Sequence, residues 1–502
     1  MNQLKGGAIL SYMTIILNNV IALTYMPYML RMLGQAEYGL YSLAASVVAY
    51  LTVLDLGFGN AIIRYTAKFR TLGMFKTQSR MYGMFIILYS IVGILCIIAG
   101  IVLYFNVDLL FSRTMTSNEQ NQLQIMLLLM TLNLAVSFPL GVFGSIISGY
   151  ENFIFQKSLN LIRVILNPIV MIIFLSLGYK AVCMVVITTI FNLVTLSLNL
   201  WYCLSKIKIK IIFNQFDYGL LKEISYYSLW IFLCAIIDRI YWSSGQFILG
   251  MYVSTSAVAI YALGIQFQGI YMGFSSAITS VLLPKVTSMV SNNTDNGELS
   301  DLFVKVGRIQ FSLLGIIIFG FILFGKEFII LWAGNDYCES YYITLLFLIP
   351  LTIPLIQNLG FIILQAKNQM RFRSLTYLII SVVSLTLSVP ISKKYGGIGC
   401  ACCVAGALIL GQIVIMNIYY KYRVGLLIGN FWVQILKMSI SPIVLSVVTY
   451  IVLSFFPVCS VISLIVAIGL YTTFYFILFW RFSLNYSEKQ FLKNIFNAIV
   501  RR

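Results

Sequence analysis

Charged and polar residues interrupt several long apolar stretches of this chain. Asp238 and Arg239 stand side by side within residues 222–250, and Trp242 and Gln246 follow them. On one helix this spacing places a charge, an indole and an amide on the same face. A charge at the centre of a membrane helix costs roughly 2.5 to 3.5 kcal/mol, so the pair should face water, a ligand or a partner. We predict that these four residues line a substrate-binding cavity.

Polar residues of neighbouring stretches are further candidates for the cavity wall. Asn18 and Asn19 form a polar pair in the first apolar stretch. Gln268 and Tyr271 lie on a helical face with other small and aromatic residues, a combination on which sugar rings stack and form hydrogen bonds. The same residues also mediate ordinary contacts between membrane helices, and packing is the favoured interpretation of this face.

Asp55 lies within the otherwise apolar segment AYLTVLDLGFGNA, residues 49–61. Arg64 follows about 13 Å along the helix, near its predicted cytoplasmic exit, so Asp55 belongs to the inner half of the span. The carboxylate is interpreted either as a cavity group or as one half of a structural ion pair with an arginine. The chain has no histidine, so Asp55 and Asp238 are the candidate carboxylates for proton coupling.

Arginines are the residues best suited to bind a phosphate or a sugar acid, because the planar guanidinium presents several donors. The candidates within or at the edge of apolar stretches are Arg31, Arg64, Arg163, Arg239 and Arg308. Only Arg239 is placed deeply by hydropathy. Arg64, Arg163 and Arg308 are equally interpreted as anchors that set the topology.

The elements that position these residues are apolar stretches too long for a soluble protein. Of the 502 residues, 60% are hydrophobic and 10% are charged, whereas globular domains carry roughly 25% charged residues. The sequence predicts an all-α integral membrane protein with fourteen transmembrane helices. The stretches are 6–31, 37–60, 81–104, 122–148, 156–178, 180–203, 222–250, 254–281, 303–325, 340–365, 372–391, 396–421, 434–456 and 458–480.

Most of the 33 basic residues fall in alternate connecting segments, counted from a cytoplasmic N-terminus. This positive-inside bias predicts a multi-pass protein of the cytoplasmic membrane with both termini in the cytoplasm. The first stretch is too long for a cleaved signal peptide, so we expect Met1 onward to remain. Topology also explains the net charge of +18, and no nucleic-acid partner is predicted.

An internal repeat divides the predicted helices into two groups of six. SGYENFIFQKSL, residues 148–159, aligns with LQAKNQMRFRSL, residues 364–375, and Pro139 matches Pro354, where each proline should kink its helix. An even number of spans per repeat predicts two parallel lobes related by pseudo-two-fold symmetry, with a substrate cleft between them. The predicted domains are an N-lobe 1–203, a cytoplasmic linker 204–221, a C-lobe 222–421, and two C-terminal helices with a cytoplasmic tail, 422–502.

The segment GQAEYGLYSLAASVVAYLTVLDLGFGNAIIRYTAKFR, residues 34–70, resembles the opening of bacterial polysaccharide repeat-unit flippases. These belong to the multidrug/oligosaccharidyl-lipid/polysaccharide exporter superfamily. The resemblance implies movement of an undecaprenyl-pyrophosphate-linked oligosaccharide from the inner to the outer leaflet by alternating access, for O-antigen or capsule assembly. It also implies membrane lipid, a polysaccharide polymerase and chain-length machinery as partners.

Other functional classes fit the sequence less well. A cation-coupled drug antiporter of the same fold is the alternative, and it should prefer acidic cavities over arginine. A membrane enzyme would need catalytic groups in sizeable outer loops, of which residues 105–121 are the longest. No ATP-binding G-x-x-x-x-G-K-[ST] segment exists, and the cysteines lack the spacing of metal ligands. We therefore predict a transporter that is not an enzyme and has no cofactor or metal.

Overall fold

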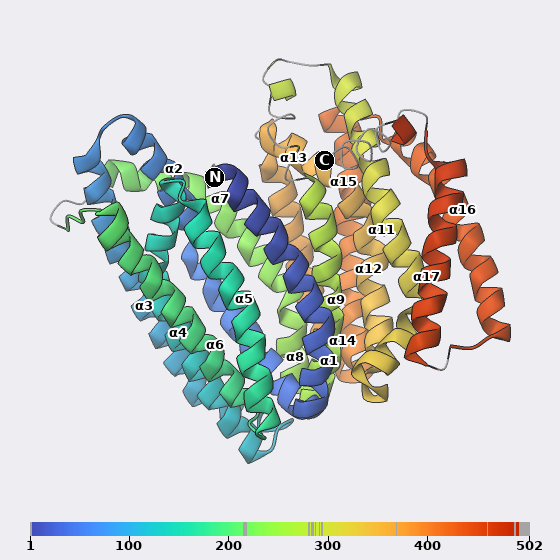
Figure 1. The fold of residues 1–502 in the computed structure, drawn as a ribbon, viewed down its shortest axis with the longest axis horizontal. Helices are drawn as coiled ribbons and strands as arrows, with labels where there is room; N and C mark the ends of the chain where they lie inside the picture. Colours follow the sequence, from blue (N-terminus) through green and yellow to red (C-terminus); the bar gives the residue numbers. More distant parts are fainter. Residues whose placement is uncertain are drawn as a thin grey trace. The chain divides into compact units, whose positions relative to one another are not determined.

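The computed structural model describes residues 3–213, 218–279, 282, 286, 288–290, 292, 295–367, 369–458, 460–485 and 488–490. The regular elements within these residues are all helices (Figure 1). Contacts divide the chain into two compact units, residues 1–262 with 388–397, and residues 263–387 with 398–502. This division differs from the predicted lobes because α7 and α8 pack with the first unit, and the lobe boundaries stay a prediction.

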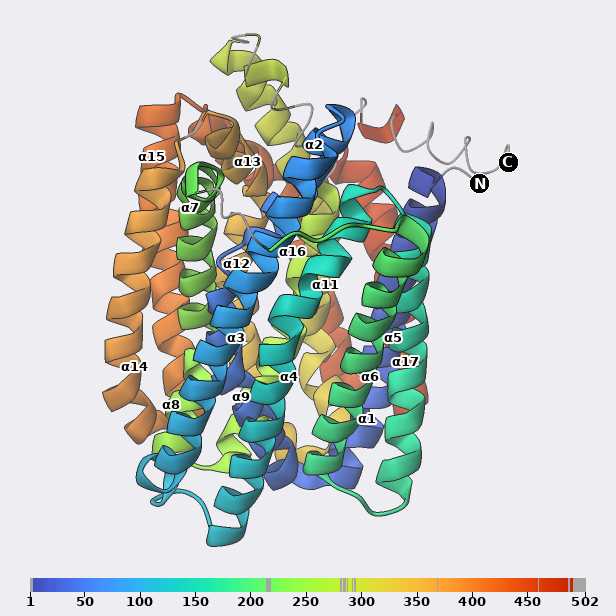
Figure 2. The ribbon, with the colours of Figure 1, turned by 90° about the vertical axis from the view of Figure 1, so that its left-hand side faces the viewer.

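The first unit is built from helices that pair along their length. In Figure 2, α4 lies beside α3 and α6, and it contacts both. Its elements are α1 (Gln3–Leu51), a 3₁₀ turn (Thr52–Asp55), α2 (Phe58–Thr71), α3 (Phe75–Phe111), α4 (Ser117–Gly149), α5 (Phe153–Ser176), α6 (Ala181–Tyr202), a π-helical turn (Cys203–Ile207), α7 (Tyr218–Trp242) and α8 (Ser244–Tyr252).

The second unit begins within α9 (Thr255–Thr279), and its long helix α11 contacts α12, α16 and α17. Its further elements are α11 (Asn296–Ala333), a 3₁₀ turn (Asn335–Tyr337), α12 (Ser340–Ile356), α13 (Asn358–Ala366), α14 (Met370–Ala407), a π-helical segment (Leu408–Ile415), α15 (Met416–Tyr419), a π-helical turn (Tyr420–Val424), α16 (Ile428–Phe455), α17 (Val461–Leu478) and a last π-helical turn (Phe479–Ser483).

The predicted apolar stretches coincide with these helices. Within the described residues, eleven helical segments are long and apolar enough to cross a membrane. Two of them, Ile9–Thr71 and Met370–Val424, each cover two predicted stretches, while residues 222–250 form α7 and α8 and are not among the eleven. The all-helical membrane architecture is therefore confirmed, and the number of fourteen spans stays a prediction. The connector predicted at 105–121 is shorter than expected, since α3 continues to Phe111 and α4 begins at Ser117.

Two glycines interrupt the longest helices where the sequence predicts breaks between apolar stretches. Gly34 within α1 has φ 75° and ψ 171°, and Gly396 within α14 has φ 59° and ψ −142°. A side chain disfavours both conformations, whereas glycine adopts them readily. The two segments of each helix can therefore run in different directions without an intervening loop.

A buried cluster of aromatic and aliphatic side chains joins α2, α3 and α4. Phe85 and Val142 are fully buried in it, and the rings of Tyr89 and Phe138 stack with centroids 6.1 Å apart. The opposite faces of the helices remain apolar and open, as at Phe105 and Leu109 of α3, which are 74% and 80% exposed. Such exposed apolar faces are expected where lipid tails surround the protein.

Two features of the structure recur in both units and support the internal repeat. Phe155 stacks on Tyr202 in the first unit with centroids 3.9 Å apart, and Phe372 stacks on Tyr419 in the second at 4.2 Å. A π-helical turn follows the second ring of each pair. The ring pairs place Phe155 opposite Phe372 in the repeat, whereas the sequence alignment of residues 148–159 with 364–375 pairs Phe155 with Arg371. The two alignments therefore differ by one residue. The symmetry relation between the lobes stays a prediction.

The matching prolines have different consequences. α12 contains Pro354 and ends at Ile356, where Gln357 separates it from α13. α4, in contrast, continues through Pro139 to Gly149. The helix is thus interrupted shortly after Pro354 but not after Pro139, and the kink expected at each proline stays a prediction.

Gly93 of α3 permits a close approach of the α4 backbone. A Cβ atom on Gly93 would lie 2.7 Å from the backbone carbonyl oxygen of Ala135, and this oxygen cannot rotate away. We expect Gly93→Ala to lower the free energy of unfolding by about 1–3 kcal/mol through overpacking. Gly141→Ala is the matched control, because nothing lies within 4 Å of its Cβ position and alanine favours the helix. Thermal unfolding in detergent checks this, and equal behaviour of the two variants would contradict it.

Candidate functional site

Polar side chains of α4, α5 and α6 gather inside the first unit. The face of α5 that carries them has Gln156, Asn160, Arg163 and Asn167, at alternating helical spacings of four and three. An asparagine and a serine of α4 and two asparagines of α6 meet this face. We call Asn133, Ser137, Gln156, Arg163, Asn192 and Asn199 the polar cluster.

Asn192 of α6 connects the three helices at the centre of the polar cluster. Arg163 Nη1 of α5 donates a hydrogen bond to Asn192 Oδ1 at 3.0 Å. The Nδ2 group of Asn192 donates to two atoms of α4, Asn133 Oδ1 and Ser137 Oγ, each at 2.7 Å. Both donors of the amide are thus used, and its carbonyl oxygen holds the guanidinium in place.

The other end of the polar cluster lies where α4 ends and α5 begins. Ser148 Oγ donates to Gln156 Oε1 at 2.6 Å, and Gln156 Nε2 donates to the Gly144 carbonyl at 3.2 Å. Asn199 of α6 is 7% exposed, and its Oδ1 has no hydrogen-bond partner in the described part of the chain. The same holds for Oδ1 of Asn167. Both oxygens are buried, so each is an acceptor enclosed within the unit.

Arg163 lies near the middle of its helix. Phe153 begins α5 about 15 Å away along the axis, and Ser176 ends the helix at a similar distance in the other direction. This position disfavours the interpretation of Arg163 as a topology anchor, because anchors lie at the ends of spans. A mid-helix charge in a membrane protein marks a functional site by default, with Asn192 as its partner here.

Asp55 has a tyrosine rather than an arginine as its hydrogen-bond donor. Tyr89 OH of α3 donates to Asp55 Oδ1 at 2.7 Å. The helix also breaks directly after Asp55, since Leu56 and Gly57 have left-handed conformations, with φ 53° and 72°. The continuous helix that we predict from Asp55 to Arg64 is therefore wrong. Asp55 is half-buried at a turn between two helices, and its role in coupling stays a prediction.

The charged and polar residues of 222–250 are divided between two helices. Asp238 is exposed and Arg239 half-buried, both in the last part of α7, and α7 ends at Trp242. Gln246 is buried in α8, which begins at Ser244. The continuous helical face that we predict for these residues is thus interrupted at Ser243. Their contribution to a substrate cavity stays a prediction.

The remaining candidates of the first unit are mostly exposed. Asn18 and Arg31 of α1 are exposed and Asn19 is half-buried. Arg64 of α2 is exposed, with its guanidinium carbon 5.9 Å from the ring centroid of Tyr65. These positions do not show whether the four residues contact substrate, so that contact stays a prediction.

Gln268 and Tyr271 lie in the second unit and support the packing interpretation. Both side chains are buried, at 3% and 1% exposure. Tyr271 OH is 2.8 Å from Thr352 Oγ1 of α12 and donates to the Leu314 carbonyl of α11 at 3.4 Å. The hydroxyl therefore joins three helices of the unit.

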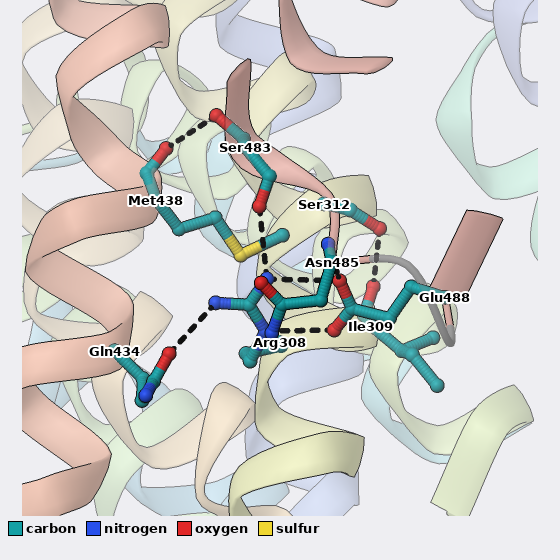
Figure 3. A network of polar contacts seen from close by, with 8 residues as sticks. All are labelled: Arg308, Ile309, Ser312, Gln434, Met438, Ser483, Asn485 and Glu488. Atoms are coloured by element: carbon teal, nitrogen blue, oxygen red, sulfur yellow. Dashed lines mark hydrogen bonds and ion pairs between the residues drawn. The ribbon is translucent and has the colours of Figure 1, made fainter. Parts of the chain in front are cut away.

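Arg308 is a structural residue rather than a cavity arginine. It is 4% exposed, and its Nε and Nη2 atoms contact the two carboxylate oxygens of Glu488 at 2.7 and 2.8 Å (Figure 3). Nη2 also donates to the Ser483 carbonyl at 2.8 Å, and Nη1 donates to Gln434 Oε1 at 3.2 Å. These contacts occupy the guanidinium, which disfavours the interpretation of Arg308 as a cavity arginine.

The fold is similar to the folds of solved membrane transporters. The structure is similar to the lipid II flippase MurJ in an inward closed conformation, with a TM-score of 0.69 and 16% identity, covering 99% of each chain. It is also similar to an inward-facing multidrug resistance MATE family transporter of the MOP superfamily, with a TM-score of 0.59 and 14% identity, covering 83% of this chain and 98% of the other. The chain thus shares its fold with these two proteins.

The sequence identifies the family to which the chain belongs. The chain belongs to the polysaccharide biosynthesis protein family, whose model matches residues 4–290. A Shigella flexneri protein named "Putative O-antigen transporter" is 22% identical over 408 residues, which cover 80% of this chain and 94% of that protein. The chain is therefore a multi-pass membrane protein of the polysaccharide biosynthesis protein family.

Proposed function

We propose that this protein moves undecaprenyl-pyrophosphate-linked oligosaccharide repeat units from the inner to the outer leaflet of the cytoplasmic membrane. The movement would proceed by alternating access and would supply O-antigen or capsule assembly. Family membership supports transport in polysaccharide biosynthesis. The names of the Shigella relative and of the similar lipid II flippase support a lipid-linked glycan as substrate.

The polar cluster of the first unit is the observation that carries this proposal. Amide and hydroxyl groups can donate and accept hydrogen bonds, and so can the hydroxyl groups of sugars. Arg163 adds one positive charge among these neutral groups, and a guanidinium forms paired hydrogen bonds with phosphate or carboxylate oxygens. This combination matches a glycan with an anionic group better than it matches an apolar cation.

Several residues outside the polar cluster are proposed to contact the substrate as well. Arg239, Asp238, Trp242, Gln246, Asn18, Asn19, Arg31, Arg64, Gln268 and Tyr271 remain proposed cavity residues, and Asp55 and Asp238 remain proposed coupling carboxylates. An inside-negative potential favours outward movement of an anion by about 2.3 kcal/mol per charge per 100 mV. The membrane potential alone therefore supports the proposed direction for a diphosphate.

The alternative is a cation-coupled drug antiporter, which the fold similarity to a multidrug transporter allows. Deletion of the gene in the host separates the two functions. We expect radiolabelled lipid-linked repeat units to accumulate in the inner leaflet and surface glycan to be lost, with recovery on complementation. Resistance to cationic dyes is measured in parallel as the control. An unchanged leaflet distribution with lost dye resistance would overturn the proposal in favour of the antiporter.

A further inference from the structure

The connector that follows α6 presents a row of lysines. After the π-helical turn Cys203–Ile207, residues 208–213 have no regular helix, and Figure 2 shows this green segment crossing the helices of the first unit. Side chains alternate along it. The residues packed against the buried cluster of α2, α3 and α4 are Ile207, Ile209 and Ile211, and the exposed ones are Lys206, Lys208 and Lys210.

The backbone of the connector is fixed to α3 and to the end of α6. Lys208 has a left-handed conformation with φ 56°, which turns the chain, and Ile209 N donates to the Cys203 carbonyl at 3.2 Å. Further along, Ile212 N donates to the Ser79 carbonyl at 3.1 Å. A Cβ atom on Gly83 would overlap the Ile212 carbonyl, so the connector lies directly on α3. The lysines are therefore displayed by a fixed segment.

The repeat provides a comparison that separates packing from function. In the second unit, the π-helical turn Tyr420–Val424 is followed by Gly425 with φ 79°, and Leu426 N donates to the Tyr420 carbonyl at 3.0 Å. The inward residues are again apolar and buried, with Val424, Leu426 and Ile428 at 3%, 2% and 6% exposure. The same turn thus forms in both units with the same inward face.

Two of the three outward residues differ between the turns, whereas Lys206 corresponds to the exposed Arg423. At the positions of Lys208 and Lys210 the second unit has Gly425 and Leu427, and Leu427 is 55% exposed. The turn can therefore form with no lysine at these two positions, whereas it keeps its apolar inward face. Because the fold does not require the two lysines, we look for their role in binding.

Basic residues predominate around the connector in the part of the chain that the structure describes. In the described part of the chain, none of the three lysines forms an ion pair with a carboxylate. Lys68 and Lys76, exposed on either side of the turn between α2 and α3, add positive charge at this end of the unit. Glu151 lies at the start of α5 and pairs with Arg70 at 3.5 Å. The positive-inside bias places this end at the cytoplasmic surface.

We propose that Lys206, Lys208 and Lys210 bind the headgroups of anionic phospholipids of the cytoplasmic leaflet. Lys206 lies in the π-helical turn, and Lys208 and Lys210 follow it on the exposed side of the connector, so the three lysines can contact phosphates at the membrane surface. A negatively charged leaflet attracts lysines close to its surface. This lipid is a bound partner that is not transported, so the inference stands apart from the proposed function.

Purified full-length protein in neutral detergent, titrated with phosphatidylglycerol or phosphatidylcholine, tests the proposal. We expect phosphatidylglycerol to raise the thermal unfolding midpoint of the wild type, since a ligand that binds only the folded state stabilises it. The combined Lys206→Gln, Lys208→Gln and Lys210→Gln variant should bind on the order of 100-fold more weakly, about fivefold for each lysine. Phosphatidylcholine should have little effect on either protein.

A second triple variant, with Lys326→Gln, Lys393→Gln and Lys394→Gln, is the matched control because it removes the same charge from exposed lysines elsewhere. It should respond to phosphatidylglycerol as the wild type does. Equal responses of both triple variants would overturn the proposal, as would an equal effect of inorganic pyrophosphate. If the connector variant does not fold, the single variants Lys208→Gln and Lys210→Gln take its place in the same titration. Each should bind phosphatidylglycerol about fivefold more weakly than the wild type.

Discussion

Arg163→Ala should abolish export of the lipid-linked glycan while the protein still inserts into the membrane at wild-type levels. The substitution removes the only charge of the polar cluster and leaves Asn192 Oδ1 without its donor. A hydrogen bond to a charged group contributes about 1.5–3 kcal/mol, so substrate binding should weaken at least about tenfold, on the order of 100-fold at the upper end. The labelled repeat unit in each leaflet is the measurement.

Two further variants separate the charge of Arg163 from its packing. Asn192→Asp keeps the side-chain shape but places a carboxylate beside the guanidinium, and this ion pair should compete with an anionic substrate. Export should therefore fall although the protein stays folded. Arg113→Ala is the control, because Arg113 is exposed between α3 and α4, and export should stay normal. Near-normal export by both Arg163→Ala and Asn192→Asp would contradict the assigned role of the polar cluster.

Arg239→Ala in the same assay tests the residue that hydropathy places most deeply. We expect loss of export with intact insertion, because the half-buried guanidinium is proposed to contact the anionic part of the substrate. Near-normal surface glycan would show that Arg239 does not bind substrate, and Arg163 would then be the arginine of the proposed site.

The helices could be predicted from the sequence because hydropathy is a local property of the chain. Stretches such as 81–104 and 122–148 contain enough apolar residues to span a bilayer without knowledge of any contact, and they form α3 and α4. Glycine gave a similar local signal at Gly34, which lies between two apolar stretches. Both signals depend on neighbouring residues alone.

The partners of the charged residues could not be predicted, because they are distant in the sequence. Arg308 and Glu488 are separated by 180 residues, and nothing near Arg308 indicates which carboxylate it meets. The break after Asp55 was missed for a related reason, since the left-handed residue there is Leu56, a type that seldom adopts this conformation.

The polar face of α5 did leave a signal in the sequence. Gln156, Asn160, Arg163 and Asn167 recur at helical spacing within an apolar helix, as Asn192 and Asn199 do in α6. Hydropathy gives amides less weight than charges, so it points to Asp238 and Arg239 rather than to this row of amides. In a bilayer, a row of amides on one helical face is as informative as a single charge, because each needs a partner.

The ion pair between Arg308 and Glu488 should hold the segment after α17 against α11 and α16. Both side chains are buried, at 4% and 6% exposure, and removal of one partner from such a pair costs about 3–5 kcal/mol. Arg308→Ala should therefore increase opening of this segment on the order of 100-fold or more, observed as faster tryptic cleavage after Lys489. Glu151→Gln is the control, because it disrupts the exposed pair with Arg70. It should change the free energy of unfolding by at most about 1 kcal/mol.

The same pair predicts a pH dependence. Burial alone would raise the pKa of Glu488, but hydrogen bonds from Arg308 and from the Asn485 backbone, with the charges of Arg308 and Lys305, lower it below the ordinary value of 4.5. A carboxylate with a lowered pKa stabilises the folded state above its unfolded pKa, and this contribution is lost as pH falls through the folded value. The difference in unfolding midpoint between wild type and Glu488→Gln should thus be full at pH 7 and shrink below about pH 4.5. A difference that stays constant down to pH 3 would show that the carboxylate charge does not stabilise this segment.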